Sequence, residues 1–182
     1  MSENQEIIIS GQMFLSEFDK SENLDESIYD KELKSMSKYQ PNLLYLFVGI
    51  NQSDGLHISE KDKIMRFFLT TWILVKGIAN IKVQKVNMDS IDKEFDNNIS
   101  YFKDINKIKD SREFEEFVKL AFQGYRQKEL YAIIFDIFLI ENRNKKPITS
   151  ADITMFCYVK SYIDVIDKII NNDYFGTNYI VK

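Results

Sequence analysis

The sequence predicts an all-α protein of about seven helices. Only two prolines and six glycines interrupt 182 residues, and this scarcity favours long helices over the frequent turns of a β-sandwich or barrel. Apolar residues make up 45% of the chain and charged residues 29%, which is typical of a globular protein with a hydrophobic core. Apolar side chains also recur at helical spacing between polar capping residues. Together these observations predict one bundle-like helical domain.

Three helices are expected in the first half of the chain, over residues 24–36, 43–50 and 59–79. Each carries an apolar stripe at helical spacing. Ser59 and Asp62 resemble a capping box at the start of the third helix, with Asp in the place that Glu usually holds. A helix that begins there has a buried face for most of its length.

Four further helices are expected at residues 91–108, 111–124, 127–142 and 150–171. Before them, residues 81–86 alternate apolar with polar, which indicates a short strand or an extended connector. Asp110 and Thr149 are start signals for the second and the last of these helices. The stretch 127–142 is apolar on nearly every face, so it is predicted to be the central helix, surrounded by the others.

The chain compared with itself predicts an internal repeat. Residues 43–62 align with residues 130–152, and the second loop is three residues longer. The alignment pairs Ser59 with Thr149 as hydroxyl caps and matches the apolar positions of the helices that follow. We therefore expect two pseudo-repeated helix-loop-helix units, each covering the apolar face that the other cannot bury alone. Chance agreement between two amphipathic helix pairs is the alternative.

Charge and composition divide the chain into an acidic N-terminal extension with a short helix (1–40), a helical domain (41–172) and a C-terminal tail (173–182). Net charge is −4, and residues 1–34 hold nine acidic and three basic residues. This balance argues against nucleic acid or an anionic membrane as a partner, whereas the extension suits a basic protein. No signal peptide and no membrane-spanning segment is recognised, so a cytoplasmic location is expected.

Residues 54–59 read Asp-Gly-Leu-His-Ile-Ser, and with the acids downstream they resemble the tellurite-resistance TerB-like family. In that family an apolar helix ends in an Asp-Gly turn, and an Ile-Ser cap opens the next helix. The pattern covers about residues 41–172, with His57 as one extra residue before the cap, and the second loop lacks the Asp-Gly. The resemblance implies an all-helical fold and acidic residues that bind metal or partners near these loops.

Asp54, Asp62 and Asp152 occupy the positions that the resemblance assigns to a metal site. Residues 51–62 also invite comparison with an EF-hand calcium loop, but Gly55 falls fifth instead of sixth, which breaks the ligand register. As a plain turn, Gly55 supplies an αL conformation without any metal. We therefore expect no cofactor, with a divalent cation as the one candidate ligand.

Two other residues are candidates for function. His57 is the only histidine and is a candidate general base, metal ligand or pH-sensitive contact, whereas a lone histidine in a loop is usually just exposed. Asp136 lies among apolar neighbours and, if buried, needs hydrogen-bond donors or a proton. Cys157 falls in an apolar helix and reads as a small core residue. With one cysteine and one histidine, a disulfide framework and a structural zinc site are excluded.

These features predict a non-enzymatic, TerB-like helical interaction module that acts in bacterial stress response or defence through a protein partner. The alternative is a small acidic immunity or inhibitor-type protein whose extension occupies a basic site. The third and least favoured hypothesis is an enzyme that uses Asp136 or His57. No Walker loop, dinucleotide fingerprint or His-Glu-x-x-His motif supports it.

Overall fold

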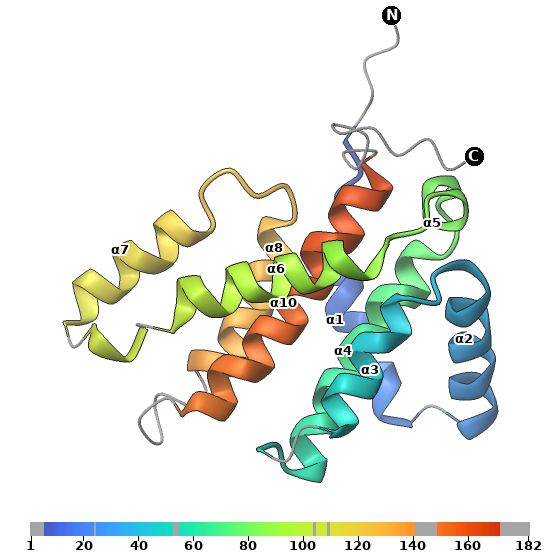
Figure 1. Ribbon diagram of the computed structural model, residues 1–182, viewed down its shortest axis with the longest axis horizontal. Helices are drawn as coiled ribbons and strands as arrows, with labels where there is room; N and C mark the ends of the chain where they lie inside the picture. Colours follow the sequence, from blue (N-terminus) through green and yellow to red (C-terminus); the bar gives the residue numbers. More distant parts are fainter. Residues whose placement is uncertain are drawn as a thin grey trace, which may run out of the picture.

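The computed structural model describes residues 6–23, 25–52, 55–103, 105–108, 110–140 and 149–171, and these residues form an all-helical protein without strands (Figure 1). The predicted fold class is therefore confirmed at this level. The described residues contain nine α-helices where about seven were expected, because α1 and α5 were not foreseen. The helices are α1 Gly11–Lys20, α2 Glu26–Tyr39, α3 Leu43–Gln52, α4 Ile58–Val75, α5 Ala79–Val83, α6 Met88–Phe102, α7 Ser111–Ala121, α8 Lys128–Phe135 and α10 Ser150–Ile170. None of the helices described is both long enough and apolar enough to cross a membrane.

The central helix is α10, not the predicted segment 127–142. Fifteen of its 21 residues are buried, and it contacts α3, α4, α5, α6 and α8 (Figure 1). By contrast, α8 exposes Ala132 and continues into a π-helical segment, Asp136–Ile140, that begins with an exposed acid. The prediction failed because Ala132 of α8 and Asp136 of the π-helical segment are exposed to solvent, so other helices do not cover this side.

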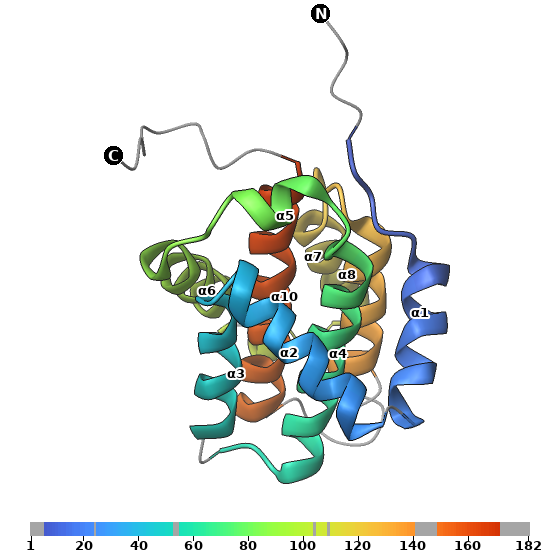
Figure 2. The same ribbon diagram turned by 90° about the vertical axis from the view of Figure 1, so that its right-hand side faces the viewer.

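The acidic N-terminal residues contribute to the same core as the rest of the chain. Phe14 is fully buried, and its ring lies 4.5 Å from that of Phe67 on α4. α1 runs along the outside of α4 and α8 (Figure 2), and α2 packs on α4 with a Glu32–Lys76 ion pair of 2.5 Å. The predicted boundary at residue 40 falls in the short turn between α2 and α3.

The segment predicted as a strand or extended connector begins as a helix. Ala79–Val83 forms α5, and only the residues from Gln84 to the start of α6 are extended. The Gln40 side chain takes the place of a neighbouring strand: its amide nitrogen donates to the Ile81 and Gln84 carbonyls, and its oxygen accepts from the Val86 N–H. This pairing satisfies buried backbone groups without a sheet.

Two of the predicted caps, Thr149 and Ser59, have different outcomes. Thr149 caps α10 and Asp152 completes the capping box, as expected. α4 begins at Ile58 with His57 as its N-cap, and the His57 N–H donates to Glu60 at 2.8 Å, so the cap predicted at Ser59 is wrong. The predicted alignment paired Ser59 with Thr149 as caps. The N-cap of α4 is instead His57, two residues before Ser59, so the two helix starts do not match in that alignment. α4 and α10 do pack together, but the pseudo-repeat stays a prediction.

Candidate functional site

The residues predicted to bind a metal have separate environments. Asp54 lies outside the described residues. Asp62 is exposed on α4. The pKa of the nearby Tyr29 is raised to about 12, first by burial of Tyr29 itself and then by the Asp62 charge. The buried Asp152 carboxylate accepts hydrogen bonds from the Thr149 N–H at 2.7 Å and hydroxyl at 2.6 Å. In the described part of the chain, no three His, Cys, Asp or Glu side chains are arranged to hold a metal ion.

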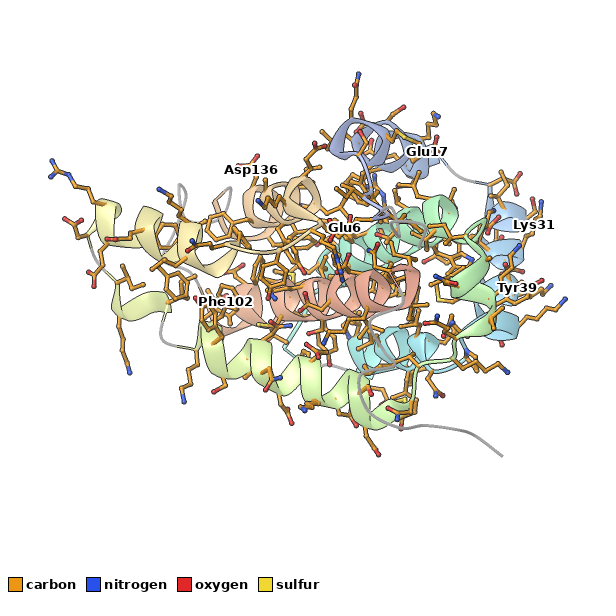
Figure 3. All side chains as sticks on the ribbon, turned by 90° about the horizontal axis from the view of Figure 1, so that it is seen from above. Glu6, Glu17, Lys31, Tyr39, Phe102 and Asp136 are labelled. Atoms are coloured by element: carbon orange, nitrogen blue, oxygen red, sulfur yellow. The ribbon has the colours of Figure 1, made fainter. Side chains whose placement is uncertain are left out.

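His57 and Asp136 both face solvent. His57 is exposed at the start of α4. Asp136 is exposed one helical turn after the exposed Ala132, on the outer side of α8 (Figure 3). Because Asp136 is hydrated, it does not need the buried donors considered for it in the sequence. The buried hydroxyl of Tyr131 on α8 donates to a different acid, Asp164.

The buried charges of this protein lie on α10 instead. Lys160 and Asp164 form an ion pair of 2.9 Å, with side chains 2% and 5% exposed. The Lys160 ammonium donates to the Tyr125 hydroxyl at 2.6 Å and lies 4.3 Å from the centre of that ring. The Tyr131 hydroxyl donates to the other Asp164 oxygen. This arrangement ties α10 to α8 and to the segment before α8.

Helix α6 completes this buried polar network. The buried Asn98 amide donates to the Ser161 hydroxyl and to Asp164, both at 2.9 Å. Asp164 therefore accepts from an ammonium, a phenol and an amide, which offsets the loss of hydration on burial. The sequence offered one signal for it, a lysine and an aspartate four residues apart inside an apolar helix.

The pKa shifts in and beside this network favour the protonation states that its hydrogen bonds require. Burial and then the Asp164 charge raise the pKa of Tyr131 well above its usual value, so the phenol stays a proton donor. Burial works against the Lys160 charge, but Asp164 and Tyr125 outweigh it and raise the pKa of that ammonium. Burial raises the pKa of the Cys157 thiol to about 12, which removes its nucleophilic form at neutral pH. The network therefore acts as a structural tie between helices.

A second arrangement binds an extended piece of main chain. The Asn171 amide accepts from the Ile7 N–H at 2.6 Å and donates to the Ile7 carbonyl at 3.0 Å. Gln127 donates to the same carbonyl and accepts from the Ile9 N–H, both at 2.8 Å. Asp167 fixes both amides by accepting from Gln127 at 2.7 Å and from Asn171 at 2.9 Å. Two oriented amides thus hold the backbone of residues 7–9.

Gly11 follows this extended piece and lies directly against α8. Its N–H donates to Glu129 at 2.6 Å. A Cβ atom added at Gly11 would lie 2.9 Å from that carboxylate oxygen, 3.0 Å from the Glu129 Cβ and 3.2 Å from the Ile133 side chain. These distances are shorter than ordinary contacts, so a side chain at this position would have to displace Glu129 and Ile133, and glycine allows the closest approach.

Aromatic side chains anchor the helix that follows. Phe14 and Phe18 are buried with ring centres 4.5 and 6.3 Å from that of Phe67. The Arg66 guanidinium lies 4.7 Å from the centre of the Phe18 ring and donates to the Phe18 carbonyl at 3.0 Å. We call residues 7–18 the N-terminal strap. We call the residues that hold it the strap-binding surface: Arg66, Phe67, Gln127, Glu129, Ile133 and Asn171.

Sequence reasoning missed the strap-binding surface, because hydrogen bonds to main chain leave no side-chain motif in the bound segment. Gly11 ahead of two phenylalanines four residues apart was the available signal. Comparison with known proteins adds no relative: the chain matches no family model, no curated protein and no solved structure.

Proposed function

We propose that the protein is a non-enzymatic helical interaction module that binds a protein segment on the strap-binding surface. The observation that carries this proposal is the way the surface holds the strap, by oriented amides on extended backbone and by aromatic anchors on a helix. Amphipathic helices that lie on apolar surfaces are a recurring mode of peptide recognition. With the resemblance to TerB-like proteins, we propose a stress response as the setting.

The chemistry of the surface defines the segment that it takes. Amide pairs accept any extended main chain, so the specificity must come from Gly11, Phe14 and Phe18. A partner segment therefore has an extended leader, a glycine where the helix begins, and phenylalanine or a similar apolar residue three and seven positions later. In the structure, the protein's own strap fills this surface, and a partner has to compete with it.

A labelled peptide of residues 6–20 tests this proposal on the full-length chain. Gly11→Ala in the protein places a Cβ against Glu129 and Ile133, which weakens its own strap and leaves the rest of the core unchanged. A loss of about 1–2 kcal/mol in strap docking exposes the surface more often, so the peptide affinity should rise roughly 5- to 30-fold over wild type. Fluorescence anisotropy measures this change.

The matched control is the same peptide with Gly11→Ala, which should bind the variant protein more weakly because the clash is now in the ligand. A second control is the full-length double variant Gly11→Cys/Glu129→Cys. A disulfide at this contact holds the strap in place, and peptide binding should appear only on reduction. Equal binding of the two peptides, or none to the Gly11→Ala protein, would contradict the proposal.

A further inference from the structure

We infer that the strap-binding surface takes the strap of a second copy of this chain, so that two chains form a dimer by exchanging residues 7–18. This inference rests on the proposed function, because it requires the surface to bind a strap that is not its own, and it names the partner. In such a dimer each surface makes the contacts seen in the monomer, with a strap from the other subunit.

The strap itself is the ligand whose fit to the surface is established. Its backbone pairs with Gln127 and Asn171, its glycine lies against Glu129, and its rings reach Phe67. A second copy brings an identical strap and an identical surface. The exchange is reciprocal and therefore closes on two chains with two-fold symmetry.

Once detached, the strap has no stable state of its own. α1 is ten residues long, and no side chain caps its N-terminus. A helix of that length is marginal in water, and Phe14 and Phe18 would lose their burial. The strap must therefore return to a surface, either on its own chain or on another.

A short hinge allows either choice. Five residues separate α1 from α2, and the first three, Ser21–Asn23, form a 3-10 turn. If this turn opened and the five residues were extended, they would span about 17 Å. Arg66 clamps the closed hinge by donating to the Ser21 hydroxyl at 3.1 Å and to Glu22 at 3.2 Å. Opening breaks these contacts, while α2 keeps its own packing on α4. The strap makes the same contacts before and after exchange. The protein concentration and the conformation of the hinge therefore decide the balance between monomer and exchanged dimer.

Crosslinking between two differently tagged full-length chains tests the exchange. One chain carries Gly11→Cys and the other Glu129→Cys, two positions whose Cβ atoms would lie 3.0 Å apart. This is shorter than the roughly 3.5–4.5 Å usual for a disulfide, so the strap must shift by about half an ångström when the bond forms. Cys157 is buried with a raised pKa and does not compete. After concentrated incubation and mild oxidation, we expect a disulfide between chains of different tag. The double variant Gly11→Cys/Glu129→Cys in one chain controls for geometry and should close within the monomer.

Wild-type chains give a second readout that needs no substitution. At low occupancy the dimer fraction measured by sedimentation should double when the total protein concentration doubles, and it should vanish in the oxidised double variant. A double variant that closes readily, together with mixed chains that never crosslink, overturns the exchange. Peptide binding without crosslinking also overturns it and leaves the proposed function standing. Crosslinking without peptide binding supports exchange and removes the external partner.

Discussion

Replacing Asp164 by asparagine should be among the most damaging conservative changes in this protein. The substitution keeps the shape of the side chain and removes the charge that faces Lys160 at 2.9 Å. At an effective dielectric of about 20 the attraction at that distance is about 6 kcal/mol, and most of it offsets the desolvation of two ions. Without Asp164 the Lys160 charge is uncompensated, so we expect a loss of about 3–5 kcal/mol in the free energy of unfolding.

Urea denaturation at neutral pH, followed by fluorescence of the buried Trp72, measures this loss. Lys160→Met added to Asp164→Asn should restore part of the stability, because it removes the unpaired charge while asparagine can still bond Tyr131 and Asn98. The single variant should also become more stable as the pH rises from 7 toward 9, below the range in which Cys157 titrates. Its buried Lys160 then gives up a proton that the unfolded chain keeps. A double variant whose loss is the sum of the two single losses would refute this reasoning.

Three further predictions concern other contacts. Asp152→Ala removes the capping box of α10 and should lower the free energy of unfolding by about 1–2 kcal/mol. This loss should be the same in EDTA and in millimolar calcium, whereas the two losses would differ if Asp152 bound a metal. Burial raises the pKa of Cys157 from 9.0 to about 12, so between these values the unfolded chain releases a proton that the folded chain keeps. Stability should then fall by about 1.4 kcal/mol per pH unit from this group, and Cys157→Ala should remove that part of the slope. Gln40→Ala leaves the backbone of residues 81–86 without its hydrogen bonds and should destabilise by about 2–4 kcal/mol. Hydrogen exchange in that segment should speed up at the same time, and unchanged exchange would show that Gln40 does not hold it.

Much of the helical architecture could be predicted because it depends on local signals. The scarcity of proline and glycine gave the fold class, and Asp110 and Thr149 marked helix starts through their own side chains. The start of α4 was misplaced because two cap patterns overlap there. His57 with Glu60 and Ser59 with Asp62 have the same spacing, and the extended backbone at His57 decides between them.

The location of the core could not be predicted from individual residues, because burial depends on contacts between residues distant in sequence. Lys160 looks like a solvent-facing position in the sequence, but it is buried because Tyr125 and Asp164 bond it. Tyr125 is distant in sequence, so no local pattern contains that bond. Conversely, segment 127–142 looks central by composition, although Asp136 and Ala132 face solvent.

The two missed helices failed for different reasons. α5 has five residues, too few to show a helical period. α1 follows three consecutive isoleucines, which favour extended structure, and it begins at Gly11, a residue of low helix propensity. Its phenylalanines four residues apart did point to a helix. The close contact of Gly11 with Glu129 is visible only in three dimensions.

The position of α10 in the chain determines when this protein can fold during synthesis. It is the last described helix, yet it covers the apolar faces of α4, α6 and α8. At ribosomal speeds of about 5–20 residues per second, the residues before it take roughly 7–30 s to emerge. Throughout that interval the faces of these helices that pack on α10 lack their partner, so the nascent chain exposes apolar surface. A product that stops before Ser150 should never acquire the native core.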